Sequence, residues 1–116
     1  MNVNKAKNSG SRTGFEQMHL PWIIVPEFIK KGEKFDVIVK VGEVSHPMSK
    51  EHYLRCIRLY VNDEQIECRT LKLDNHSEAT FKLSLKRNSV IRIWAECNLH
   101  GIWEAEKKII LYLGNG

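Results

Sequence analysis

Hydrophobic and polar residues alternate along most of this chain with a period of two, which is the spacing of a β-strand with one buried face. The alternation is clearest in residues 33–42 and 79–86, where every second position is apolar. No segment has the spacing of a long amphipathic helix. The predicted strands lie at residues 20–28, 33–42, 53–62, 65–73, 79–86, 89–97 and 103–113.

Short turn signals separate these segments and indicate the fold class. Pairs such as Lys31-Gly32, Asn62-Asp63 and Arg87-Asn88 favour tight turns. About seven short strands in 116 residues predict an all-β fold, an immunoglobulin-like β-sandwich. Residues 20–28 contain two prolines and suit an edge strand, whereas residues 46–52 break the pattern and predict a loop or a single helical turn.

The length predicts one domain with one core. Residues 1–14 are polar and predict a mobile N-terminal arm, so the domain is expected at residues 15–116. No apolar run approaches the roughly 20 residues of a membrane helix, and the N-terminal residues lack the apolar stretch of a secretory signal. We therefore expect a cytoplasmic protein with no membrane partner and with reduced thiols.

The formal net charge is +4, but the lysines and arginines are scattered through the alternating segments. They form no dense run and no recognition-helix pattern, so a nucleic-acid partner is not expected. One interpretation that stays open is a metal-free sandwich whose basic surface binds a protein or an anionic polymer.

Candidate chemistry gathers at strand ends and loops. The loops at one end of a sandwich cluster in space although they are far apart in the sequence. A thiolate and several imidazoles brought together there would form a strong site for a divalent transition metal. Singly, each of these residues is more often a loop or packing residue, so the prediction rests on the combination. The candidate ligands are His19, His46, His52, Cys97 and His100.

Other residues of the same types carry weaker signals. His76 lies in a polar turn with no partner motif, and we expect it to take no part in metal binding. Cys56 lies in a strand pattern and predicts a core residue, whereas the place of Cys68 stays open and ligation is expected at neither. Trp94 and Trp103 are expected to be packing residues.

The combined spacing resembles the iron-binding domain of superoxide reductases, the neelaredoxin and desulfoferrodoxin family. The resemblance extends from Phe15 to Glu106 and rests on three motifs: HLP at His19, HPMSKEH from His46, and CNLHGIW from Cys97. It implies an immunoglobulin-like sandwich that binds one mononuclear non-haem iron, which alternates between Fe2+ and Fe3+. The chain has no Cys-x-x-Cys pairs for a second centre, as in the one-iron form of the family.

The resemblance also implies a ligand arrangement and a reaction. The four histidines would form the equatorial plane of a square pyramid, and Cys97 would be the axial ligand. The site would reduce superoxide by one electron to hydrogen peroxide, and an external donor, by resemblance rubredoxin, would restore the ferrous state. Homodimers or tetramers are implied as well. The alternative is an iron-binding electron-transfer or sensor module of the same fold without efficient catalysis.

One part of the family pattern is missing from this chain. A Glu-Lys pair usually precedes the first histidine, but Gln17 and Met18 stand there, and Glu16 is one residue out of register. Lys50, between two candidate ligands, is a candidate catalytic residue because its ammonium could attract the anion at the open position. A solvated loop charge is an equally open interpretation of Lys50. The missing pair is the best support for the alternative without efficient catalysis.

Overall fold

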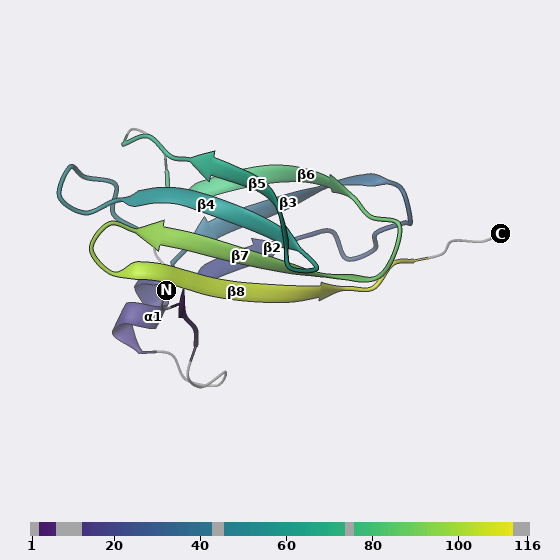
Figure 1. Cartoon of the computed structure of the whole chain (residues 1–116), viewed down its shortest axis with the longest axis horizontal. Coiled ribbons are helices and arrows are strands. Elements are labelled where there is room, and N and C mark those ends of the chain that lie inside the picture. Colours follow the sequence, from purple (N-terminus) through teal and green to yellow (C-terminus); the bar gives the residue numbers. More distant parts are fainter. Residues whose placement is uncertain (1–2, 7–12, 43–45, 74–75, 113–116) are drawn as a thin grey trace.

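The structure, a computed structural model, describes residues 3–6, 13–42, 46–73 and 76–112. These residues form two β-sheets packed face to face and one short helix at one end (Figure 1). The five-stranded sheet has the order β1-β8-β7-β4-β5, and the three-stranded sheet has the order β2-β3-β6. The elements are β1 (Val3–Asn4), α1 (Gly14–His19), β2 (Pro21–Ile24), β3 (Lys34–Val41), β4 (Leu54–Val61), β5 (Glu64–Thr70), β6 (Glu78–Ser84), β7 (Ser89–Cys97) and β8 (Gly101–Ile109).

Each of the seven predicted strands has a counterpart among β2 to β8, which confirms the predicted β-sandwich. The alternation in β3 and β6 matches burial, because every second side chain lies between the sheets. Strand β2 is an edge strand, as its flanking prolines predicted. Residues 46–52 form a loop, also as predicted.

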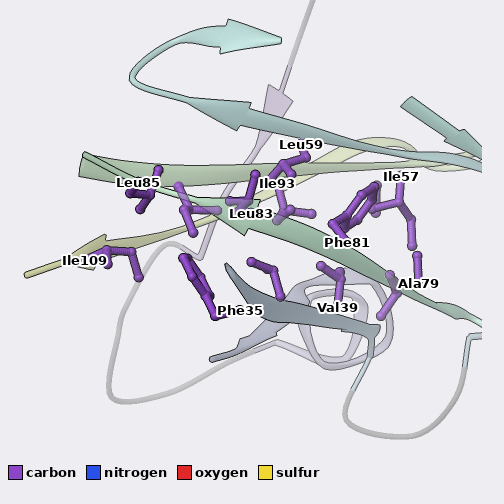
Figure 2. Packing of buried hydrophobic residues seen from close by; sticks show 14 of the residues in the cluster. Phe35, Val39, Ile57, Leu59, Ala79, Phe81, Leu83, Leu85, Ile93 and Ile109 are labelled. Carbon is purple, nitrogen blue, oxygen red and sulfur yellow. The ribbon is translucent and has the colours of Figure 1, made fainter. Parts of the chain in front are cut away.

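The core fills the space between the two sheets. Phe35, Val39 and Phe81 of the three-stranded sheet lie opposite Ile57 and Ile93 of the five-stranded sheet (Figure 2). Removing these side chains from water is the main force that holds the sheets together. The packed slab fixes the strand ends, so the loops that leave them are held by a rigid support.

The N-terminal segment has contacts that the sequence did not predict. Val3 pairs in parallel with Ile102, and Asn4 pairs with Trp103 of β8. The ammonium of Lys5 lies 3.0 Å from the carboxylate of Glu104. Part of the predicted arm therefore lies against the sheet. The division at residue 15 stays a prediction, and residues 1–2 and 7–12 of the arm lie outside the described residues.

Helix α1 was also not predicted, and a capping box starts it. The hydroxyl of Thr13 accepts a hydrogen bond from the amide of Glu16 at 3.2 Å. The carboxylate of Glu16 accepts one from the amide of Thr13 at 2.8 Å. This reciprocal pair satisfies two backbone donors at the helix start. It also engages the carboxylate of Glu16, which lies one residue before the position where the resembled family usually has a glutamate.

Three segments that are distant in the sequence meet at one end of the sandwich. Figure 1 shows α1, the loop before β4 and the turn between β7 and β8 at the same end of the molecule, at the left of the view. No helix in the described part of the chain is long and apolar enough to cross a membrane.

Candidate metal centre

The five candidate ligands come together at this end of the sandwich. His19 ends α1, His46 and His52 bound the loop before β4, Cys97 ends β7, and His100 lies in the turn before β8. One possible ligand atom from each of four residues, all but His100, lies within 4.8 Å of the others. His100 joins them because its Nδ1 lies 3.0 Å from Nε2 of His19 and 3.7 Å from Sγ of Cys97.

The four imidazoles follow one another around a common centre. Ring centroids are 4.9 Å apart for His19 and His46, and 4.6 Å apart for His46 and His52. They are 5.0 Å apart for His52 and His100, and 4.8 Å apart for His100 and His19. Across the centre of this arrangement, the ring centroids of His19 and His52 are 6.0 Å apart. The rings are thus placed as the four corners of a distorted square, with the sulfur of Cys97 adjacent to it.

The nitrogens of this square fit a metal ion. Nδ1 of His46 lies 2.8 Å from the carbonyl oxygen of Pro47, which only accepts, so Nδ1 carries the proton and Nε2 keeps its lone pair. Nε2 of His46 and Nε2 of His52 are buried without a hydrogen-bond partner. Buried polar atoms are rarely left this way, and a metal ion at the centre would satisfy both.

The spacing of the other two imidazoles agrees with this fit. Nitrogens of imidazole ligands lie about 2.0–2.1 Å from a bound zinc ion, so two of them at a right angle lie about 3 Å apart. Nε2 of His19 and Nδ1 of His100 are 3.0 Å apart. One histidine therefore presents Nδ1 where the others present Nε2.

Burial favours the neutral form, which binds metals, in two of the imidazoles. Desolvation lowers the pKa of His46 from 6.5 to about 4, the carbonyl of Pro47 opposes this in part, and the neighbouring imidazoles lower it further. Desolvation also lowers the pKa of His52, with a contribution from the charge of His100. Neutral imidazoles with one thiolate suit iron, copper or zinc.

Ser77 holds the backbone of His46 through its side-chain hydroxyl. The Ser77 hydroxyl accepts a hydrogen bond from the His46 amide at 2.9 Å and donates one to the carbonyl of Val41 at 3.3 Å. The Val41 amide donates to the carbonyl of Ser77 at 2.9 Å. The end of β3 and the start of the ligand loop are thereby tied to the segment before β6.

Trp103 supports His19 and His100 together. Its ring stacks on His19 with centroids 4.8 Å apart and planes 19° apart. Its Nε1 donates a hydrogen bond to the carbonyl of His100 at 3.0 Å. Trp103 is therefore a packing residue, as predicted, and it contacts the ring of one candidate ligand and the backbone of another.

Asn98 joins the Cys97 turn to the His52 loop. Its side-chain carbonyl accepts a hydrogen bond from the Tyr53 amide at 2.8 Å, and its side-chain amide donates one to the carbonyl of Glu51 at 3.1 Å. Its backbone amide donates to the carbonyl of Tyr53 at 3.1 Å. Three hydrogen bonds from one residue thus fix the distance between two ligand segments.

Replacing Asn98 by alanine should weaken metal binding by about 10-fold or more, because losing a residue that orients ligands typically costs 10- to 100-fold. Competition with a chelator of known affinity measures the change. Asn88→Ala is the matched control, since the Asn88 side chain also caps a backbone amide, that of Leu111 at 2.8 Å, outside the ligand segments. An equal loss of affinity in both variants would show that Asn98 acts through general stability alone.

The remaining candidates lie outside the cluster. His76 is exposed, and Lys50 is exposed on the ligand loop. Gln17 is exposed on α1, and the Glu16 carboxylate takes part in the capping box. Cys56 is buried as predicted, but it lies on the outer face of the five-stranded sheet and not in the core between the sheets. Cys68 is exposed.

The fold and this cluster define a β-sandwich protein with a histidine and cysteine site suited to a transition metal. Residues 11–106 match the family model described as Desulfoferrodoxin, and the chain belongs to that family. A superoxide reductase from Pyrococcus horikoshii is 30% identical, covering 80% of this chain and 88% of that protein. A neelaredoxin from Megalodesulfovibrio gigas is 29% identical, covering 82% and 88%. The solved structure of a superoxide reductase (neelaredoxin) from Ignicoccus hospitalis has a TM-score of 0.74 and 34% identity, covering 81% of each chain.

Proposed function

We propose that this protein is a superoxide reductase, which converts superoxide to hydrogen peroxide by adding one electron and two protons. The observation that carries the proposal is the square of four imidazoles beside one buried thiol, in a chain of the desulfoferrodoxin family. Iron bound there would supply one-electron chemistry between its ferrous and ferric states. Protein purified without added metal should contain one iron per chain and should form peroxide from superoxide.

We assign the ligands to His19, His46, His52, His100 and Cys97. Neutral imidazoles leave the positive charge of the metal uncancelled. The thiolate of Cys97 would donate electron density to the metal from inside the protein, because Cys97 is only 3% exposed. His19 and His46 are buried, while His52 and His100 are partly exposed. Superoxide and solvent protons would therefore enter from the side of His52 and His100.

Lys50 is proposed to attract superoxide to this entrance. Its ammonium is exposed on the loop between His46 and His52, and a positive charge near a bound anion stabilises it. Lys50→Met should slow superoxide reduction about 10-fold at low salt, equivalent to about 1.4 kcal/mol, and should leave the iron content unchanged. Pulsed generation of superoxide measures the rate.

Lys31→Met is the matched control for this experiment. Lys31 is also exposed, but it lies just before β3, at the opposite end of that strand from the ligand loop. Both substitutions lower the net charge equally and so weaken long-range steering equally. Equal rates in the two variants would contradict a local role for Lys50.

A second candidate function is an iron-binding electron-transfer or sensor module without efficient catalysis. Two observations favour it: Gln17 and Met18 stand where the family has Glu-Lys, and Glu16 is held by Thr13. Such a module would bind iron and exchange electrons, but it would consume superoxide no faster than spontaneous dismutation. The rate of peroxide formation separates the two candidates.

We propose an external one-electron donor, with rubredoxin as the expected one. Exposed apolar side chains border the cluster and support docking of a small protein. Leu99, between Cys97 and His100, is 58% exposed, and Met18, beside His19, is 40% exposed. A homo-oligomer, which the family resemblance implies, and a cytoplasmic location remain expectations.

A further inference from the structure

Two further thiols lie side by side on the outer face of the five-stranded sheet. In the register of β4 and β5, Cys56 pairs with Thr70 and Arg58 pairs with Cys68. Directly opposite residues share a face of the sheet, as do residues two apart in one strand. Cys56 and Cys68 are therefore diagonal neighbours on one face. Ile57, between Cys56 and Arg58, points into the core, so this face is the outer one.

The two thiols differ in exposure and are linked through Arg58. Cys68 is exposed on β5, whereas Cys56 is 7% exposed. Arg58 is directly opposite Cys68 in the strand register, so its cationic side chain is on the same face of the sheet as both thiols. Burial, together with the charge and hydrogen bonding of Cys68, raises the pKa of Cys56 to about 11. Cys68 is thus the accessible thiol beside a cation, and Cys56 is its protonated neighbour.

We propose that Cys56 and Cys68 form a peroxide-responsive thiol pair that hydrogen peroxide oxidises to a disulfide. The Cys68 thiol releases its proton, and the thiolate attacks one peroxide oxygen. The O–O bond breaks, and the other oxygen leaves as hydroxide, which takes up the released proton and becomes water. The Cys56 sulfur then attacks the resulting sulfenic acid, the S–O bond breaks, and the thiol proton leaves with the oxygen as a second water. Overall, two thiols lose two electrons and two protons, and one peroxide becomes two waters.

Strand geometry allows the bond after a small shift of β5. Diagonal neighbours in a sheet lie about 7–8 Å apart, slightly beyond the largest usual Cα separation in disulfides, about 6.8 Å. Strand β5 is at the edge of its sheet and pairs on one side only among the described strands. Because β5 pairs with β4 alone in the described part of the chain, it can shift without breaking hydrogen bonds to a second strand. Its register with β4 is already irregular between Leu59 and Tyr60.

The pair lies close to the metal centre along the same strands. In the register of β4 and β7, Cys56 is opposite Glu96, and Leu54 is opposite Cys97. The thiol pair is therefore across the sheet from the proposed axial ligand. Hydrogen peroxide is the product of the proposed function, so the protein would itself supply the oxidant next to the thiol pair. Only this source of oxidant rests on the proposed function.

Peptide mapping of the metal-loaded protein tests the pair directly. Reduced protein is treated with added hydrogen peroxide, its free thiols are alkylated, and it is digested with trypsin. Cleavage after arginine places Cys56 in residues 56–58 and Cys68 in residues 59–69. We expect these two peptides to become joined, to separate on reduction, and to be joined to no peptide containing Cys97. Because the peroxide is added, the result does not depend on whether the protein reduces superoxide.

Single-thiol variants separate the two roles. In Cys56→Ser, the sulfenic acid at Cys68 should persist and react with dimedone, whereas in Cys68→Ser the buried Cys56 should stay reduced. Two results would overturn the proposal. One is oxidation of wild-type Cys68 to sulfinic acid with no joined peptide. The other is a fully reduced pair at peroxide concentrations that oxidise free cysteine.

Discussion

Replacing Cys97 by serine should slow superoxide reduction by about 100-fold, equivalent to about 2.7 kcal/mol at the barrier. The sulfur of Cys97 lies 3.7 Å from Nδ1 of His100, within the imidazole cluster. A serine hydroxyl stays protonated at neutral pH and donates far less electron density than a thiolate. The oxidised variant should also lose the visible charge-transfer absorption of a thiolate bound to ferric iron. Stopped-flow kinetics and visible spectra measure both effects.

Cys56→Ser is the matched control for this substitution. Cys56 is also buried, but it lies on the outer face of the sheet and outside the cluster. The Cys56→Ser variant makes the same chemical change as Cys97→Ser. Because Cys56 lies outside the cluster, this variant should keep both the absorption and the rate. If Cys97→Ser kept the absorption of the wild-type protein, the axial assignment would be wrong.

Metal removal should lower the thermal midpoint by about 15 °C. A ligand that binds only the folded state stabilises it by about 4 kcal/mol when its free concentration is about 1,000-fold above its dissociation constant. For a domain of this size each kcal/mol corresponds to about 4 °C. Without metal, Nε2 of His46 and of His52 stay buried without partners. Scanning calorimetry of the loaded and metal-free proteins measures the difference.

Histidine variants assign this stabilisation to the cluster. His46→Ala should remove most of the difference between the loaded and metal-free midpoints, because it deletes one proposed ligand. His76→Ala should keep the full difference, since His76 is exposed and outside the cluster. An undiminished difference in His46→Ala, or loss of metal from a folded His76→Ala protein, would contradict the proposed ligand set.

Much of the fold was predictable because burial follows the alternation of residue types. Strand β7 has exactly the predicted bounds, and the alternate residues of β6 point inward as expected. The candidate site was predictable because its motifs lie at strand ends, where loops converge. His19, for example, directly precedes Leu20 and β2. In both cases the information is local in the sequence.

Other features depend on tertiary contacts that no local pattern contains. Helix α1 has six residues, too few for a helical period, and only the spacing of Thr13 and Glu16 indicated it. The hydrogen bonds of Asn98 reach residues 45 and 47 positions away. The proximity of Cys56 and Cys68 required the register of β4 and β5, which alternation alone does not define.

The products formed from a known amount of superoxide test the central claim most directly. Reduced, iron-loaded protein that carries Cys56→Ser and Cys68→Ser, so that the thiol pair consumes no peroxide, is mixed in excess and anaerobically with superoxide. Peroxide and dioxygen are measured together. The proposed function predicts one peroxide for each superoxide consumed, one ferrous site oxidised, and no dioxygen. One peroxide and one dioxygen for every two superoxides, with the ferrous sites unchanged, would contradict it, because superoxide would then have dismutated without taking electrons from this protein.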